Sequence, residues 1–182
     1  MNQVVASPQM EQVQKSFPIA TNAAPKALVI GCSDPKIQFA IRCFLINRLN
    51  IPREEWGTEM EEQNYVRLTV AGGIASLTEQ EVFKEEFGFM WRHSKLFVAK
   101  MPSIELVIQL SHEPCKKYLD MHERMGDSFL MGYGDMRTRQ ISDLRRVETI
   151  LPKYVPRTVA IESYFGRLVA EGDQARMVFD RI

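Results

Sequence analysis

Apolar residues follow two patterns along this chain: short continuous runs, and longer stretches in which they return every three or four positions. The run at 27–31 reads Ala-Leu-Val-Ile-Gly and is preceded by Pro25. Such a run is typical of a strand that is buried on both faces of a sheet. The segments 65–70 and 104–110 are interpreted in the same way. We therefore predict central strands at these positions.

The stretches that follow these strands have the apolar spacing of helices. Helices are predicted over about 35–49 and 136–151, and another begins near residue 116. A further helix is expected over about 76–91, because Ser76 and Glu79 have the spacing of a capping box. Residues 92–103 fit either an extension of that helix or a loop.

Strands that alternate with helices predict an α/β fold with a mostly parallel β-sheet flanked by helices on both faces. Late strands are expected at 157–162 and 175–179, near an edge of the sheet. A chain of 182 residues with 45% hydrophobic content suits one domain, which we assign to residues 25–182. Residues 1–24 form an N-terminal arm, which either packs on a partner subunit, packs elsewhere on its own subunit or frays. Within the arm, the spacing of Met10, Val13 and Phe17 fits a short helix.

Charge and cysteine content narrow the classes of partner and compartment. The 23 basic residues balance the 23 acidic ones, so no net field attracts nucleic acid or an anionic membrane, and neither is expected as a partner. Three cysteines are an odd number and do not resemble a disulfide framework. No segment has the apolar length of a secretory signal or a membrane span. The expected location is therefore cytoplasmic.

Candidate metal ligands follow two of the predicted strands. Cys32 comes directly after the first strand, and His112 and Cys115 come after the third. In a parallel sheet, ligands bind beyond the carboxyl ends of the strands, so these side chains are expected to meet there. Two thiolates and one imidazole are good ligands for a zinc ion, and the fourth tetrahedral position is left to water or a side chain. The sequence therefore predicts an open zinc site of the catalytic kind.

The order and spacing of these residues resemble the β-class carbonic anhydrases. Their pattern is Cys-x-Asp-x-Arg after the first strand and His-x-x-Cys about two strands later; this chain has Cys-Ser-Asp-Pro-Lys at 32–36 and His-Glu-Pro-Cys at 112–115. The Ala-Gly-Gly turn at 71–73 is similar to the family's glycine turn, and the match extends loosely from Pro25 to about Lys117. The resemblance implies a zinc-dependent lyase that interconverts carbon dioxide and bicarbonate through zinc-bound hydroxide, assembled as a homodimer or higher homo-oligomer.

The resemblance also assigns roles to residues around the metal. Asp34 would be either held by the basic residue at 36, which leaves the fourth zinc position to water, or itself the fourth ligand. Asp34 and Lys36 are therefore the catalytic candidates. Gly72 and Gly73 would line the substrate pocket, or form only a tight turn. From the residues alone, Asp34 has the alternative role of a helix-start residue that binds backbone amides.

The chain departs from the family pattern in three ways. Lys36 stands in place of the arginine, Ala23 in place of a glutamine that binds substrate in many relatives, and Lys116-Lys117 in place of glycine and a small residue. A lysine lacks the planar fork that orients a carboxylate through two bonds, so Asp34 is expected to be less firmly restrained. Two alternatives stay open: a zinc hydrolase of carbonyl sulfide or carbon disulfide on the same scaffold, and a non-catalytic zinc-binding module.

Overall fold

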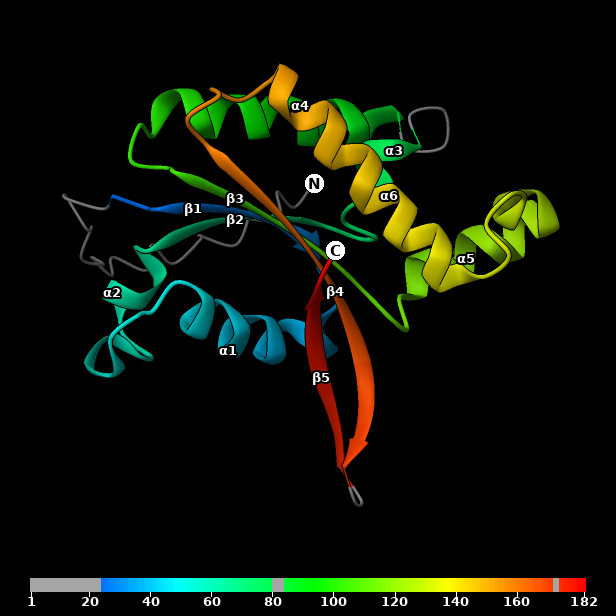
Figure 1. Cartoon of the computed structure of the whole chain (residues 1–182), viewed down its shortest axis with the longest axis horizontal. Helices are drawn as coiled ribbons and strands as arrows, with labels where there is room; N and C mark the ends of the chain where they lie inside the picture. The colour runs from blue at the N-terminus through cyan, green and yellow to red at the C-terminus, as the bar shows by residue number, and fades with distance from the viewer. Residues whose placement is uncertain (1–23, 80–83, 172–173) are drawn as a thin grey trace, which may run out of the picture.

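The computed structural model describes residues 24–79, 84–171 and 174–182. Residues 1–23 of the N-terminal arm, with its expected helix and Ala23, lie outside these residues. The described chain forms an α/β fold in which helices cover both faces of one five-stranded sheet (Figure 1). Within the described residues, no helix combines the length and the apolarity needed to cross a membrane.

The sheet has the strand order β2-β1-β3-β4-β5. Its first four strands in the chain run parallel, and β5 is antiparallel to β4, so the prediction of a mostly parallel sheet is confirmed. The β4–β5 hairpin continues past the rest of the sheet (Figure 1), which makes β4 longer than the expected strand. The strands are β1 Ala27–Cys32, β2 Tyr65–Val70, β3 Leu106–His112, β4 Ala160–Glu171 and β5 Gln174–Arg181.

The longer helices are α1 Gln38–Arg48, α4 Lys84–Lys100, α5 Lys116–Met125 and α6 Met136–Ile150. The expected helices at 35–49 and 136–151 and the start near 116 are confirmed, and α4 covers most of the segment that was left open. Beyond these, the described chain has short helical turns at η1 Pro35–Ile37, η2 Arg53–Glu55, α2 Glu59–Glu62, α3 Ala75–Thr78, η3 Gly126–Leu130 and η4 Leu151–Lys153.

The alternation of side chains along β1 divides the core between the two faces of the sheet. Ala27 and Val29 belong to one buried cluster, together with the apolar face of α1. Leu28 and Ile30 belong to a second cluster, with the apolar faces of α4 and α6. Full burial of a valine, leucine or isoleucine side chain stabilises the fold by about 1.5–3 kcal/mol. The continuous apolar run at 27–31 therefore reflects a strand covered on both sides, as expected.

The capping box predicted at Ser76 and Glu79 is not formed, and that prediction was wrong. Ser76 lies inside α3, where its hydroxyl donates to the carbonyl of Ala71 at 3.5 Å. The turn begins earlier, because the carbonyls of Gly72 and Gly73 accept the amides of Ala75 and Ser76. Glu79 instead forms an ion pair with Arg139 of α6. A tertiary charge pair has replaced the local bond that the spacing indicated.

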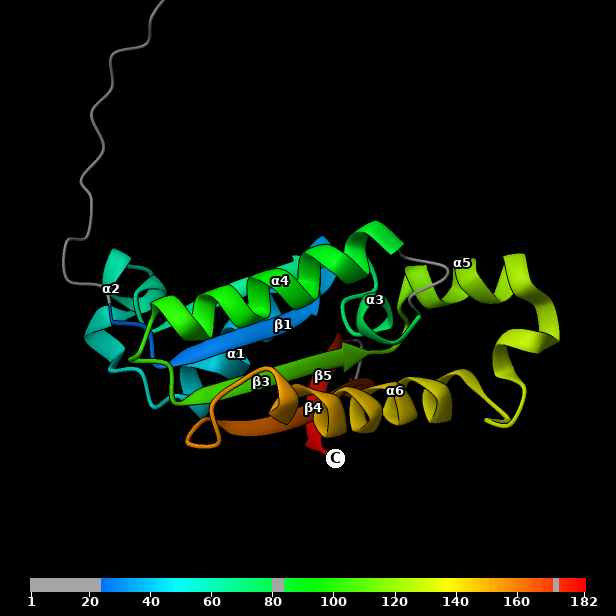
Figure 2. The same ribbon diagram turned by 90° about the horizontal axis from the view of Figure 1, so that it is seen from above.

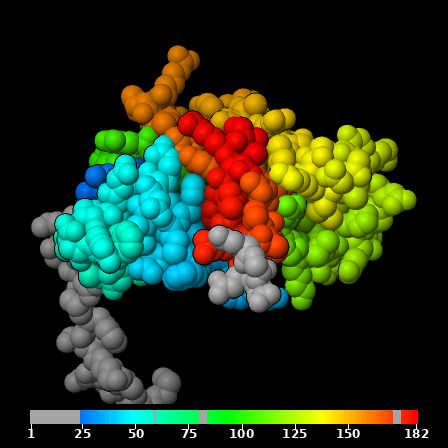
Figure 3. Space-filling view, turned by 60° about the horizontal axis from the view of Figure 1, so that its bottom comes forward, coloured from blue at the N-terminus to red at the C-terminus, as the bar shows by residue number. Residues whose placement is uncertain are grey.

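Helix α1 and the β4–β5 hairpin lie side by side on one face of the molecule (Figure 3). Phe44 of α1 packs against Phe179 of β5, with ring centroids 4.6 Å apart, and against Tyr164 of β4 at 4.7 Å. The antiparallel edge strand is thereby attached to the helix layer as well as to its neighbouring strand.

Candidate metal centre

The predicted ligands converge at the carboxyl ends of β1 and β3, which are parallel neighbours. Figure 2 shows both strands pointing towards the end of the sheet at which α5 begins. Cys32 is the last residue of β1 and His112 the last residue of β3, while Cys115 immediately precedes α5. One ligating atom from each residue lies within 4.8 Å of the others, and the two sulfur atoms are 4.0 Å apart. Together they form a group that can hold a metal ion.

The burial of these residues fits a bound metal. All of them are buried, and His112 is only 2% exposed. Neither ring nitrogen of His112 has a hydrogen-bond partner among the described residues. A buried polar atom without a partner costs about 1–3 kcal/mol, so an imidazole left in this state needs a reason. Coordination of a metal would use one of these nitrogens, and a set of two sulfurs and one nitrogen suits zinc chemistry.

The two thiols influence each other's ionisation. The contact with Cys115 lowers the pKa of Cys32 to about 4; burial opposes the shift, and His112 with the amides of Asp34 and Gly72 assists it. The same contact, together with burial, raises the pKa of Cys115. One thiol of the pair therefore ionises readily, whereas the second proton is held. A metal that binds both sulfurs as thiolates must displace that second proton.

The glycine turn after β2 presses against the end of β1. Gly73 has φ +49°, and a Cβ added there would lie 2.6 Å from the amide nitrogen of Cys32. Gly72 has φ +81°, and its Cβ would lie 2.8 Å from Cγ of Lys117. Both positions thus need glycine for the backbone angle and for the close approach. The turn therefore packs against the backbone of Cys32, one of the candidate ligands, in addition to connecting β2 to the helix that follows.

The Asp34 side chain binds the backbone of the turn that follows it. Its Oδ1 accepts the amide of Lys36 at 2.9 Å and caps η1, the helix-start role that the sequence offered as an alternative. Within residues 24–79, 84–171 and 174–182, the Asp34 carboxylate forms no ion pair with the Lys36 ammonium group. The carboxylate is consequently oriented by the turn and not by the neighbouring lysine.

A surface hollow of about 500 Å³ opens beside Cys32. Its wall contains basic and acidic side chains from the β1–α1 loop and from the start of α5, and it includes Gly72 but not Gly73. Cys32 is the candidate ligand that borders the hollow, so a metal there would be approachable from this side. The lining residues are Cys32, Ser33, Asp34, Pro35, Lys36, Ala71, Gly72, Lys116, Lys117 and Asp120.

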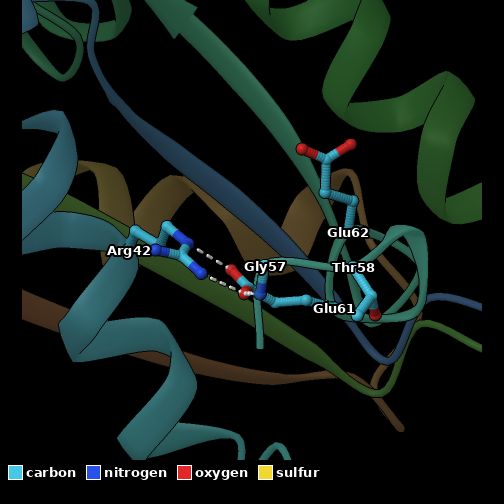
Figure 4. A pocket seen from close by; sticks show the side chains of 5 residues that line it. All are labelled: Arg42, Gly57, Thr58, Glu61 and Glu62. Atoms are coloured by element: carbon cyan, nitrogen blue, oxygen red, sulfur yellow. Dashed lines mark hydrogen bonds and ion pairs between the residues drawn. The ribbon is translucent and has the colours of Figure 1, made fainter. Parts of the chain in front are cut away.

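A second hollow, lined by Arg42, Gly57, Thr58, Glu61 and Glu62, has a structural role (Figure 4). Arg42 of α1 donates to both carboxylate oxygens of Glu61, at 2.6 and 2.5 Å, and the amide of Gly57 donates at 2.7 Å. These bonds use the acceptors of the nearly buried Glu61. They attach the segment before β2 to α1.

The sequence interpretation missed a buried polar network behind Cys115. Tyr118, one turn further along α5, donates its hydroxyl to Oδ2 of Asp143 at 2.9 Å, and Nε of Arg139 donates to the same oxygen at 3.2 Å. Arg139 also pairs with Glu79. A signal was present, because Arg139 and Asp143 share a helix face at i, i+4 spacing with the apolar residue Val147. The network fixes α5, and with it Cys115, against α6.

No protein-family model and no curated protein sequence matches the chain. Similar solved structures include the carbonic anhydrase of Streptococcus mutans, which is 12% identical, with 90% of this chain and 87% of that chain covered and a TM-score of 0.45. The β-carbonic anhydrase isoform I of Trichomonas vaginalis is 9% identical, with 91% and 87% covered and a TM-score of 0.47. A tetrameric β-carbonic anhydrase of Sordaria macrospora is 15% identical, with 80% of this chain and 77% of that chain covered and a TM-score of 0.41.

Proposed function

We propose that this protein is a zinc-dependent lyase of carbonic anhydrase type that interconverts carbon dioxide and bicarbonate. The observation that supports it most is the convergence of Cys32, His112 and Cys115, whose ligating atoms lie within 4.8 Å of one another at the carboxyl edge of a parallel sheet. The resemblance of the segments 32–36 and 112–115 to the β-class pattern points to the same chemistry.

The ligand residues would bind zinc through the two sulfurs and one imidazole nitrogen. When bound, zinc supplies a Lewis acid that lowers the pKa of water to roughly 7. The buried ring of His112 keeps its nitrogens away from solvent, and Cys32 borders the 500 Å³ hollow through which a small substrate would enter. Gly72 keeps that wall free of a side chain.

Asp34 and Lys36 would control access to the metal. Asp34 borders the hollow, and its bond to the amide of Lys36 holds the carboxylate at the mouth of the site. Release of this single bond would free the carboxylate to act as the fourth ligand. Lys36 would supply positive charge at the entrance without the planar fork of an arginine.

The test combines zinc analysis with stopped-flow carbon dioxide hydration over about pH 6.5 to 9, a range that spans the pKa of water on zinc. We expect near one zinc per chain and hydration above the buffer rate. Cys115→Ser should lose both, whereas Cys43→Ser, which alters the cysteine outside the group, should keep both. Protein purified without chelator that contains no zinc would contradict the proposal.

The same samples separate the alternative functions. Zinc-loaded protein that hydrolyses carbonyl sulfide or carbon disulfide, and does not hydrate carbon dioxide, is the hydrolase. Zinc-loaded protein that is inert towards all of these gases is a non-catalytic zinc-binding module. Either result would overturn the lyase assignment while retaining the metal centre.

The resemblance also leads us to propose a homodimer or higher homo-oligomer, and the odd number of scattered cysteines leads us to propose a cytoplasmic location. Light scattering during size-exclusion chromatography tests the first, with a mass of 21.0 kDa as the outcome that would contradict it. Fractionation of the source cells tests the second.

A further inference from the structure

Gln38, the first residue of α1, closes the loop that carries Cys32 and Asp34. Its Nε2 donates to the carbonyl oxygen of Cys32 at 3.0 Å and to that of Asp34 at 2.8 Å. A side-chain amide has two N–H donors, so both are used within this loop. Gln38 thereby connects the end of β1 to the start of α1 and limits movement of the residues between them.

Arg67 of β2 binds the other side of the Gln38 amide. Its guanidinium donates to Oε1 of Gln38. Arginine has donors and no acceptor, so the amide oxygen must face Arg67, and the nitrogen is then directed towards the two carbonyls. The two carbonyls require the same orientation, and the bond to Arg67 holds the side of the amide that they do not contact. Arg67 therefore restricts the movement of the Gln38 side chain.

The same strand holds the loop at a second point. The amide of Ser33 donates to the carbonyl of Val70, the last residue of β2, at 3.0 Å. Arg67 lies three positions earlier, opposite Val29 of β1 in the parallel register. The loop is thus held from β2 through its backbone and, by way of Gln38, through a side chain.

We propose that Arg67 and Gln38 are positioning residues of the metal centre. Arg67 acts through Gln38, and Gln38 fixes the backbone of Cys32, the candidate metal ligand, and of Asp34, the candidate gate. Lys36 lacks the planar guanidinium group that could hold the Asp34 carboxylate through two bonds. Arg67, which belongs to another strand, supplies a guanidinium group to this loop by way of Gln38. The inference rests on the proposed function in taking zinc as the metal.

The test measures zinc affinity by chelator competition in Gln38→Met, Arg67→Met and the double variant. Loss of a residue that orients a metal ligand typically costs 10–100-fold in metal affinity, and we expect a loss of about 10-fold in each single variant. Because Arg67 acts through Gln38, the double variant should also lose about 10-fold and not about 100-fold. Arg67→Lys retains a donor and should recover most of the affinity. The absorption spectrum of the Co²⁺ form should change in the same variants.

Gln63→Met is the matched control, since Gln63 precedes β2 and lies at the opposite end of that strand from the loop. Its zinc affinity should stay within about twofold of wild type. The proposal is overturned if Arg67→Met also stays within that range, or if the two losses multiply. Should Arg67→Met fail to fold, Gln38→Met carries the test, and zinc affinity within about twofold of wild type in that variant overturns the proposal.

A measurement without metal keeps this inference separate from the proposed function. Amide hydrogen exchange of Ser33 and Lys36 in zinc-free protein should be about 10-fold faster in Gln38→Met and Arg67→Met, and unchanged in Gln63→Met. Unchanged exchange in all variants would refute the positioning role even if zinc binds. If the wild type binds no zinc but the exchange differs as expected, the proposed function fails, whereas the role of Gln38 and Arg67 in holding the loop stands.

Discussion

The sulfur atoms of Cys32 and Cys115 lie 4.0 Å apart although 83 positions separate the residues in the sequence. The approach follows from the parallel pairing of β1 with β3, which brings the carboxyl ends of both strands to one edge of the sheet. His112, at the end of β3, completes the group. A metal held there would link β1, β3 and α5, so its effect on stability should be large.

Removal of the metal should destabilise the fold. A ligand that binds only the native state stabilises it by about 4 kcal/mol when present at 1,000 times its dissociation constant. We therefore expect a strong chelator to lower the melting temperature of zinc-loaded wild-type protein by several degrees. Cys115→Ser should melt at the lower temperature with or without chelator. A wild-type melting temperature that does not respond to chelator would argue against a structural contribution of the metal.

Gly73→Ala should damage both the fold and the metal centre. The added Cβ would lie 2.6 Å from the amide nitrogen of Cys32, and the residue would keep an unfavourable φ of +49°. We expect a loss of about 3 kcal/mol in the free energy of unfolding, measured by urea denaturation, and weaker zinc binding.

Gly132→Ala is the control for this substitution. Gly132 has φ +85°, but nothing lies within 4 Å of an added Cβ. It should lose about 1–2 kcal/mol from backbone strain alone and bind zinc normally. Equal losses in both variants would mean that the close approach to Cys32 is unimportant.

Lys36→Arg should raise carbon dioxide hydration. An arginine at this position could hold the Asp34 carboxylate through two parallel bonds, which a lysine cannot form. We expect an increase in kcat on the order of threefold or more. Lys26→Arg makes the same substitution before β1, at the opposite end of the strand, and should leave kcat unchanged. A lower kcat in Lys36→Arg would show that a loosely held Asp34 favours turnover.

Tyr118→Phe should destabilise the metal-free protein in a pH-dependent way. Burial raises the pKa of Asp143, and the hydroxyl of Tyr118 is among the groups that oppose this by binding the carboxylate. Without that bond the folded-state pKa rises further, so the variant loses more stability as pH increases above the unfolded value of 3.8. We expect a deficit of about 1–2 kcal/mol near neutral pH that shrinks towards about pH 4.

Urea denaturation in chelator across this pH range measures the deficit. Tyr154→Phe, which removes the hydroxyl of a tyrosine that is 44% exposed, provides the control and should show little change at any pH. A Tyr118→Phe deficit that is constant with pH would indicate that the hydroxyl does not bind an ionised Asp143.

Arg48→Met should cost more stability than the equivalent change in a more exposed pair. Arg48 binds the Glu162 carboxylate, whose side chain is 8% exposed, and the variant would leave that carboxylate with the weaker contacts from Arg181 and Tyr164. A buried carboxylate that loses its main partner destabilises the fold. Because Arg48 itself is 36% exposed, we expect the free energy of unfolding to fall by about 2 kcal/mol.

Arg167→Met removes the comparable partner of Asp180, in a pair that is 35% and 42% exposed. It should cost less than about 1 kcal/mol, because surface ion pairs are weak.

The pKa of Glu162 is lowered overall: burial raises it, but Arg48 and Tyr164 outweigh that effect. The ion pair between Arg48 and Glu162 therefore stabilises the fold at pH values above the unfolded-state pKa of 4.5. Its contribution disappears as the pH falls through the lowered folded-state pKa of Glu162. Equal losses in the two variants at neutral pH would contradict this account.

The elements that the sequence predicted well are those whose signal is local. The run at 27–31 is apolar on every position because β1 is covered on both faces, and the spacing of Leu144 and Val147 follows the buried face of α6. The residue types at 32, 112 and 115 restricted the chemistry to soft metal ligands before any contact was known. These features depend on neighbours within a few positions, so the amino-acid order contains them.

Tertiary structure alone decided which of several local possibilities each polar residue took. Glu79 fits a capping box by spacing, yet it pairs with Arg139, because α3 and α6 are brought together on one face of the sheet. Asp34 suited either a lysine partner or a helix start, and it caps η1. Arg67 and Gln38 meet because β2 lies next to β1 in a particular register. Polar side chains have no periodic pattern that names their partner; strand order and register supply it, and these follow from the packing of the whole chain.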